Sequence, residues 1–309
     1  MNRFIAALAA AGFGCTLLAM GTHATAAQAA DDPLRAAIAD SRRTPANVAR
    51  DPSRHPYETL RFFGITPTMT VAEIWPGGGW YTEILAPYLS KEGKLVSAGS
   101  DPKSADEAER KSAQRTADKY AAKPDQFGKI ALGVFSPPQN VTIAPAGSLD
   151  MVLTFRNIHN WIADLDEKDL KKAFAGIYAS LKPGGVFGVV EHRLPENRPQ
   201  DKSASTGYVH ASYVIKLAEE AGFKLAAQSE INANPKDNAE HENGVWALPP
   251  TYANKDKDRA SYAAIGESDR MTLKFVKVAD KSGDKGGAKP AAAKPADKPA
   301  AKPATKPAK

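Results

Sequence analysis

The segment VAEIWPGGGWYTEIL at positions 71–85 could hold a ligand by its backbone. An apolar stretch typical of a strand leads into Glu73, and Gly77, Gly78 and Gly79 then precede a stretch typical of a helix. Glycines let a ligand approach the main chain, and free N–H groups at a helix start can meet a carboxylate or a phosphate. The turn therefore predicts a ligand-binding loop. A tight connection with no ligand is the alternative.

Two histidines follow expected strands, where they could exchange a proton with a ligand. His159 comes after the apolar run 149–155, and Glu191 and His192 come at the end of the run 186–191. Imidazole is the side chain whose ordinary pKa suits acid–base chemistry near neutral pH. We treat His159 and His192 as candidate catalytic bases or acceptor-binding groups, and Glu191 as a group that binds a polar acceptor or orients His192. Purely structural hydrogen bonding is the alternative for each.

Several other catalytic spacings are absent from the sequence. It has no HxxxH, HExxH or HxH pair, so no metal ion is expected. It also has no GxSxG elbow, no GxxxxGK[ST] loop and no complete GxGxxG turn with a following acid, which argues against a hydrolase, an NTPase and a nicotinamide enzyme. The one cysteine, Cys15, lies in an expected leader, so the mature chain has no thiolate nucleophile.

The body of the chain alternates short apolar runs with amphipathic stretches, which indicates a mainly parallel sheet covered by helices. The expected strands are at 70–75, 94–98, 129–134, 149–155, 186–191, 223–230 and 271–278, and the expected helices are at 80–90, 103–122, 167–181 and 208–221. Because the carboxyl ends of parallel strands meet at one edge of a sheet, we expect the glycine turn and the two histidines to lie close together.

Five segments resemble the class I S-adenosylmethionine-dependent methyltransferases, and in particular a branch of predicted exported methyltransferases. The turn at 73–79 is similar to the family's acidic-x-G-x-G-x-G motif, and the other similar segments are 148–161, 181–193, 213–225 and 269–278. The resemblance spans residues 44–278. It implies a Rossmann-like, seven-stranded α/β fold in the order 3-2-1-4-5-7-6, with helices on both faces and an antiparallel last strand. It also implies S-adenosylmethionine as the cofactor.

The resemblance assigns roles to individual residues. Glu73 and the loop from Gly77 to Gly79 would hold the methionine end of the cofactor, and Asn157 would line its pocket. The segments 157–161 and 191–193 would face the transferred methyl group.

The chain departs from the family at three places. Trp75 stands where the family has its first glycine, and Gly99 stands where it has an acid for the ribose hydroxyls. Asp101, two residues later, could replace that acid if its loop bends back. The segment 133–139, after the third strand, has no acid for the adenine amino group.

Two segments outside these motifs could also face a ligand. The segment 54–65 either caps the cofactor cleft or packs as a helix on the sheet edge. The stretch 231–270 is long for a connection, and we expect acceptor recognition in its parts 232–237 and 266–270, with a solvated loop as the alternative.

The amino-terminal residues 1–29 have the pattern of a signal peptide: Arg3, an apolar run over 4–20 and the small-residue site 27–29. A membrane anchor is the alternative, although the run is shorter than the roughly 20 residues that a span needs. No later run approaches that length, so no transmembrane segment is expected in the domain, 30–280. The expected location is the periplasm or outside the cell.

The carboxyl-terminal residues 281–309 repeat Lys-Pro among alanines, which predicts a disordered tail. They hold eight Lys and two Asp, which equals the whole chain's excess charge of +6. The rest is neutral, so no nucleic-acid partner is expected. The tail is a solubilising spacer or a weak contact for anionic envelope polymers.

Two functional hypotheses remain open from the sequence. The first is a methyltransferase that uses S-adenosylmethionine and acts on a small-molecule or envelope-associated acceptor. The second is a non-catalytic periplasmic binding protein that keeps the methyltransferase fold, which the missing adenosine anchors and the export signal favour.

Overall fold

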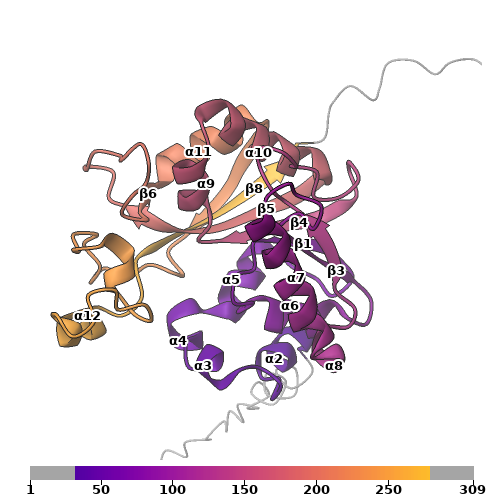
Figure 1. Cartoon of the computed structure of the whole chain (residues 1–309), viewed down its shortest axis with the longest axis horizontal. Helices are drawn as coiled ribbons and strands as arrows, with labels where there is room; N and C mark the ends of the chain where they lie inside the picture. Colours follow the sequence, from indigo (N-terminus) through magenta and orange to yellow (C-terminus); the bar gives the residue numbers. More distant parts are fainter. Residues whose placement is uncertain (1–31, 279–309) are drawn as a thin grey trace, which may run out of the picture. The chain divides into compact units, whose positions relative to one another are not determined.

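The computed structural model describes residues 32–278, which form an eight-stranded sheet with helices on both faces (Figure 1). The predicted signal peptide, 1–29, and the predicted tail, 281–309, lie outside the described residues. The strands are β1 (Thr70–Ile74), β2 (Lys94–Gly99), β3 (Ala131–Val134), β4 (Leu149–Phe155), β5 (Leu181–Leu194), β6 (Val209–His210), β7 (Phe223–Ser229) and β8 (Arg270–Lys277).

The strand order confirms the predicted fold class. The sheet runs β3-β2-β1-β4-β5-β8-β7, and the short strand β6 pairs with β5 beside this path. Strands β1 to β5 are parallel where they pair, whereas β8 lies antiparallel between β5 and β7. Since β7 and β8 are the predicted sixth and seventh strands, the observed order is the predicted 3-2-1-4-5-7-6. The short strand β6 was not predicted.

The sheet is covered by helices that differ in length. In chain order they are α2 (Pro33–Ile38), α3 (Pro45–Val48), α4 (Asp51–Arg54), α5 (Pro56–Phe63), α6 (Thr82–Leu89), α7 (Glu107–Ala121), α8 (Pro124–Phe127), α9 (Ile158–Asp164), α10 (Glu167–Ser180), α11 (Ala211–Glu220), the 3₁₀ turn η1 (Gly244–Ala247) and α12 (Arg259–Ile265). Figure 1 shows α9, α10 and α11 on one side of the sheet and α2 to α8 on the other.

Successive side chains of the central strands enter two separate hydrophobic cores. Val71 packs into the core beneath α5 and α6, and its neighbour Ala72 packs into the core beneath α10 and α11. Met151 and Val152 of β4 divide in the same way. This period of two, with both faces covered, is the expected pattern of a buried parallel strand.

Local contacts explain why two of the observed helices begin later than predicted. The helix α7 begins at Glu107, not at 103, because the side chain of Asp106 accepts a hydrogen bond from the backbone N–H of Ala108. The helix α11 begins at Ala211, because Val209 and His210 pair with β5 instead. The helix α9, directly after β4, was not predicted.

Within residues 32–278, no helix combines the length and the apolar character that crossing a bilayer requires.

Candidate functional site

The chain turns sharply after β1 because three residues there have a left-handed backbone. The angle φ is +46° at Trp75, +55° at Gly77 and +81° at Gly79. This conformation is open to glycine and strained for tryptophan. A Cβ added to Gly77 or Gly78 would meet no atom within 4 Å, so this part of the loop borders open space.

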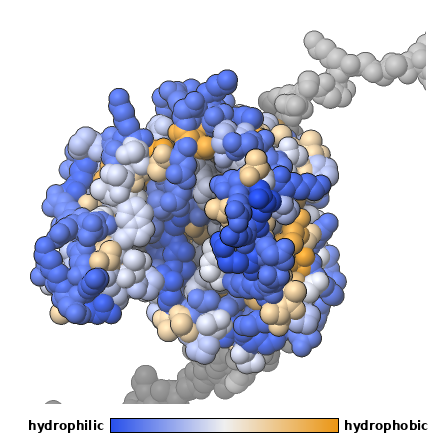
Figure 2. Space-filling model, in the orientation of Figure 1, coloured by the Kyte–Doolittle hydropathy of each residue, from blue (hydrophilic) through white to orange (hydrophobic). Residues whose placement is uncertain are grey.

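A cavity of about 390 Å³ lies at the carboxyl ends of β1, β4 and β5. The loop after β1 supplies Gly77 and Gly78, and the other two strands lead to His159 and His192. The facing wall comes from α3, α4 and the excursion between β7 and β8. Figure 2 shows the surface hollowed beside this excursion, with hydrophilic residues in the hollow. The structure therefore brings together the glycine turn and the two histidines, as their strand-end positions predict.

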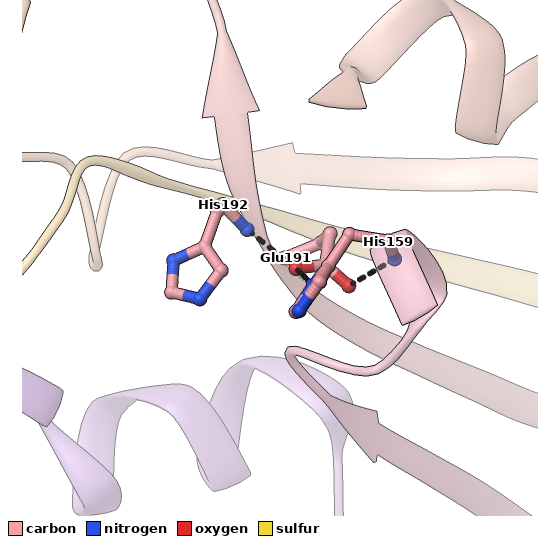
Figure 3. A group of neighbouring side chains, drawn as sticks. All are labelled: His159, Glu191 and His192. Carbon is pink, nitrogen blue, oxygen red and sulfur yellow. Dashed lines mark hydrogen bonds and ion pairs between the residues drawn. The ribbon is translucent and has the colours of Figure 1, made fainter. Parts of the chain in front are cut away.

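Glu191 holds His159 in place behind the cavity wall (Figure 3). Its Oε1 lies 3.0 Å from His159 Nδ1, and its Oε2 accepts a hydrogen bond of 2.6 Å from the backbone N–H of Ile158. The side chain of Glu191 is fully buried and does not line the cavity. When Nδ1 donates to the carboxylate, Nε2 of His159 is left as the basic nitrogen of the ring.

His192 has a different environment from His159. Its Nδ1 lies 2.6 Å from Ser268 Oγ, and its ring centroid is 5.3 Å from that of His159. Burial lowers the pKa of His192 well below 6.5, and His159 and Arg156 lower it further. His192 is therefore neutral at pH 7. The prediction that Glu191 orients the His192 side chain was wrong: neighbouring strand residues point to opposite faces, and Glu191 reaches His192 only at its backbone N–H, 2.8 Å away.

His159, Glu191 and His192 form a cluster whose possible ligand atoms lie within 4.8 Å of one another, close enough to surround a metal ion. Both oxygens of Glu191 already accept hydrogen bonds from backbone N–H groups. The arginines Arg54, Arg156 and Arg270 all act on His192 and would repel a cation. The donor set therefore fits a hydrogen-bonded Glu–His pair better than a metal site.

Four arginines and one carboxylate form the positive side of the site. Glu267 accepts hydrogen bonds from Arg50 Nε at 2.6 Å, Arg54 Nε at 3.1 Å and Arg270 Nη1 at 3.2 Å. Burial would raise the pKa of Glu267, but these arginines lower it to about 2. Arg156, also in the cavity wall, makes no side-chain hydrogen bond or ion pair with any residue between 32 and 278. Positive charge is therefore in excess.

Two of the predicted cofactor-binding residues do not reach the cavity. Glu73 is 2% exposed, and its carboxylate accepts a hydrogen bond of 2.6 Å from Thr82 Oγ1. It lies on the same face of β1 as Val71, so its side chain points under α6 instead of toward the strand ends. Gly79 is covered by Lys119, whose Nζ would lie 2.7 Å from an added Cβ.

Asp101 also lies outside the cavity, and Asn157 lies within it with another role. The Asp101 carboxylate accepts a hydrogen bond from the backbone N–H of Lys103 at 2.8 Å, so it stabilises its own turn instead of bending back. Asn157 lines the cavity, but its amide donates to Ile74 O at 2.9 Å and Thr154 Oγ1 at 3.1 Å. Asn157 therefore fixes the end of β1 against β4.

The indole of Trp75 lies where the resemblance places the adenosine of the cofactor. Its Nε1 donates a hydrogen bond of 2.7 Å to Phe135 O, after β3, and its ring packs edge-on against Trp161. The side chain thus reaches from the end of β1 across β2 to the end of β3. The residues present fit the amino-acid end of S-adenosylmethionine at Gly77 and Gly78. They do not fit its adenosine end while Trp75 holds this position.

Sequence reasoning did not identify several residues of the cavity wall. Arg54 was included only in a segment with two possible roles, and the structure places it in the wall. Glu267 and Ser268, from the predicted recognition segment 266–270, also line the cavity, whereas 232–237 does not. Trp246, edge-on to His159 with centroids 6.0 Å apart, was missed entirely. The available signal was a tryptophan in an excursion rich in Asn, Asp, Pro and Lys.

No protein-family model matches the chain, and no curated protein matches it either. Solved structures do match. A methyltransferase from Aquifex aeolicus that depends on S-adenosylmethionine is 16% identical, with a TM-score of 0.45 over 81% of this chain and 96% of that one. A geranyl diphosphate methyltransferase in complex with S-adenosylmethionine is 13% identical, with a TM-score of 0.46 over 79% and 95%. The [4+2]-cyclase SpnF is 15% identical, with a TM-score of 0.47 over 80% and 92%.

The strand order, with β8 antiparallel between β5 and β7, gives by itself the Rossmann-like architecture that the sequence predicts.

Proposed function

We propose that the cavity is the active site of an S-adenosylmethionine-dependent methyltransferase acting on a small-molecule or envelope-associated acceptor. The observation that carries the proposal is that an open glycine loop, Gly77 and Gly78, borders the same cavity as the Glu191-supported base His159. The cofactor would supply an electrophilic methyl group there. The protein's contribution is to position an acceptor and to remove its proton.

Each polar residue has a distinct part in this proposal. His159 accepts the acceptor's proton at Nε2, and Glu191 stabilises the resulting imidazolium through Nδ1. His192, held neutral, contributes a hydrogen bond to the acceptor. Asn157 keeps the glycine loop in position through the carbonyl of Ile74. Glu191 and Asn157 are therefore positioning residues.

Trp75 determines whether the cofactor can enter. The indole must leave Phe135 O for the adenosine to fit, which costs one partly buried hydrogen bond and two aromatic contacts. This same observation favours a second candidate function, a binding protein that keeps the fold and uses no cofactor. The two candidates differ in one measurable property, which is the affinity of the wild-type protein for S-adenosylmethionine.

Calorimetry with S-adenosylmethionine and its demethylated product tests the proposal. We expect weak binding by the wild type and binding about tenfold tighter or more by Trp75→Gly, because glycine empties the adenosine position and relieves the left-handed φ. Gly78→Asp is the matched loss variant: its Cβ meets nothing, so the fold should persist while a carboxylate repels the ligand's carboxylate. No binding by the wild type, with binding by Trp75→Gly, overturns the proposal in favour of the cofactor-free binding protein.

The proposal also places the protein in the periplasm or outside the cell, on the strength of the sequence pattern at 1–29. Cell fractionation that finds the full-length chain in the cytoplasm contradicts this location.

A further inference from the structure

The guanidinium of Arg54 is buried, fixed and incompletely bonded. Arg54 is 2% exposed; its Nε lies 3.1 Å from Glu267 Oε2, and its guanidinium lies 4.8 Å from the centre of the Trp80 ring. Its two terminal nitrogens, Nη1 and Nη2, are buried and have no hydrogen-bond partner among residues 32–278. Leaving such buried donors unpaired costs free energy. The fork formed by Nη1 and Nη2 is therefore suited to bind a hydrogen-bond acceptor.

Arg54 is one of the residues that line the cavity, and other positive groups lie near it. Arg50 and Arg156 line the same cavity, and Arg270 lies beside it. Among residues 32–278, the only acid in the cavity wall is Glu267, and Glu191 lies behind His159. Even when Glu191 is counted, four positive side chains face two negative ones. Burial lowers the pKa of Arg54 to about 9, so it remains charged at pH 7.

We propose that this cavity binds an oxyanion of the acceptor, a carboxylate or a phosphate, in the fork of Arg54 with Arg50 and Arg156 beside it. Arginine presents its two terminal nitrogens in a plane that matches both groups bidentately. His159 and Trp246 lie on the other side of the cavity and would face the rest of the molecule.

This inference rests on the proposed function and adds the chemical class of the acceptor. S-adenosylmethionine carries a carboxylate, an ammonium and a sulfonium, so it is a net cation at neutral pH. A cavity with excess positive charge disfavours a cation. An anionic acceptor would offset that charge, so we expect each ligand to increase the affinity of the other.

Calorimetry without cofactor tests the oxyanion site directly. The probes are inorganic phosphate and citrate, with chloride at equal ionic strength as the control anion. We expect Arg54→Gln to weaken binding about tenfold or more, because it removes a buried charged fork. Arg115→Gln, on the exposed face of α7, removes the same charge elsewhere and should leave binding unchanged.

A second cavity variant keeps the test decisive if Arg54→Gln fails to fold. Arg156→Gln removes a side chain with no hydrogen bond or ion pair in the described part of the chain, so it should fold and also weaken binding about tenfold. Phosphate binding alone identifies a phosphorylated acceptor, and citrate binding alone identifies a carboxylate. Binding of neither probe overturns the inference, as does equal binding by the wild type and both cavity variants.

The two proposals can fail separately. Anion binding without any binding of S-adenosylmethionine supports the oxyanion site and overturns the methyltransferase. Binding of S-adenosylmethionine with no binding of either anion supports the methyltransferase and overturns the oxyanion site.

Discussion

Glu191 and Glu73 are both buried carboxylates, and their partners differ. Glu191 accepts hydrogen bonds from backbone N–H groups, including that of Ile158 at 2.6 Å, and contacts His159 Nδ1 at 3.0 Å. In the described part of the chain, the Glu73 side chain has one hydrogen bond, from Thr82 Oγ1, at 2.6 Å. Burial therefore dominates at Glu73 and raises its pKa from 4.5 to about 7, although Thr82 and Lys119 act in the opposite direction.

The raised pKa of Glu73 makes a prediction about stability. Between pH 4.5 and about 7 the unfolded chain loses this proton while the folded chain keeps it, so the free energy of unfolding falls as pH rises. The loss is roughly 3 kcal/mol and levels off above pH 7. Glu73→Gln cannot ionise, so its melting temperature should exceed that of the wild type at pH 8 and equal it near pH 4.5.

Glu58→Gln, which changes an exposed carboxyl group on α5, is the matched control for this experiment. An equal difference between the wild type and Glu73→Gln at both pH values would show that burial of the charge at Glu73 is not the cause.

At the scale of elements, the excursion between β7 and β8 is fixed at both ends. Arg193 of β5 donates to Glu230, at its start, at 2.8 and 2.9 Å, and to Asp269, at its end, at 2.8 and 2.9 Å. Asp237 accepts hydrogen bonds from Tyr208 Oη at 2.9 Å and from the backbone N–H of Asp269 at 2.8 Å. These bonds hold the wall of the cavity that carries Trp246 and Glu267.

Arg193→Met should therefore loosen this wall. We expect a loss of about 1–3 kcal/mol in the free energy of unfolding, because a partly buried contact with Asp269 and an exposed contact with Glu230 are removed. Backbone amides of 237–267 should exchange hydrogen faster, while those of β1 and β4 are unchanged. Lys257→Met breaks a pair with Glu242 whose side chains are 61% and 58% exposed, and should leave both properties unaltered. Unchanged exchange in Arg193→Met contradicts the role of Arg193.

At the scale of the whole molecule, charge is distributed unevenly along the chain. Residues 281–309 hold as much excess positive charge as the whole chain, and they contain none of the large apolar side chains that build a core. In the rest of the chain positive and negative side chains balance in number. Three arginines gather around Glu267. The net basic charge of the sequence therefore comes from 281–309, whereas the positive charge of the cavity is a local excess.

Deletion of 281–309 should leave the melting temperature and the affinity for phosphate unchanged, because a segment of this composition has no apolar groups to bury. Retention of the protein on anionic vesicles at low salt should decrease and should lose its salt dependence. A fall of several degrees in the melting temperature on deletion contradicts this prediction.

The elements and their order could be predicted from the sequence because they depend on local patterns. The seven long strands follow from apolar runs, and the glycine turn, His159 and His192 meet because parallel strands end at one edge. Helix starts were less predictable, since a single cap such as Asp106 shifts a boundary by several residues.

The direction and burial of individual side chains depended on the tertiary structure. Arg54 and Glu267 are more than 200 positions apart, and no local pattern brings them together. Trp75 has the left-handed backbone of a glycine position, but only its contacts with Phe135 and Trp161 decide where its indole lies. The sequence by itself therefore determined which strand ends form the site. The tertiary structure decided what space and charge remain there, because both depend on contacts between residues distant in the chain.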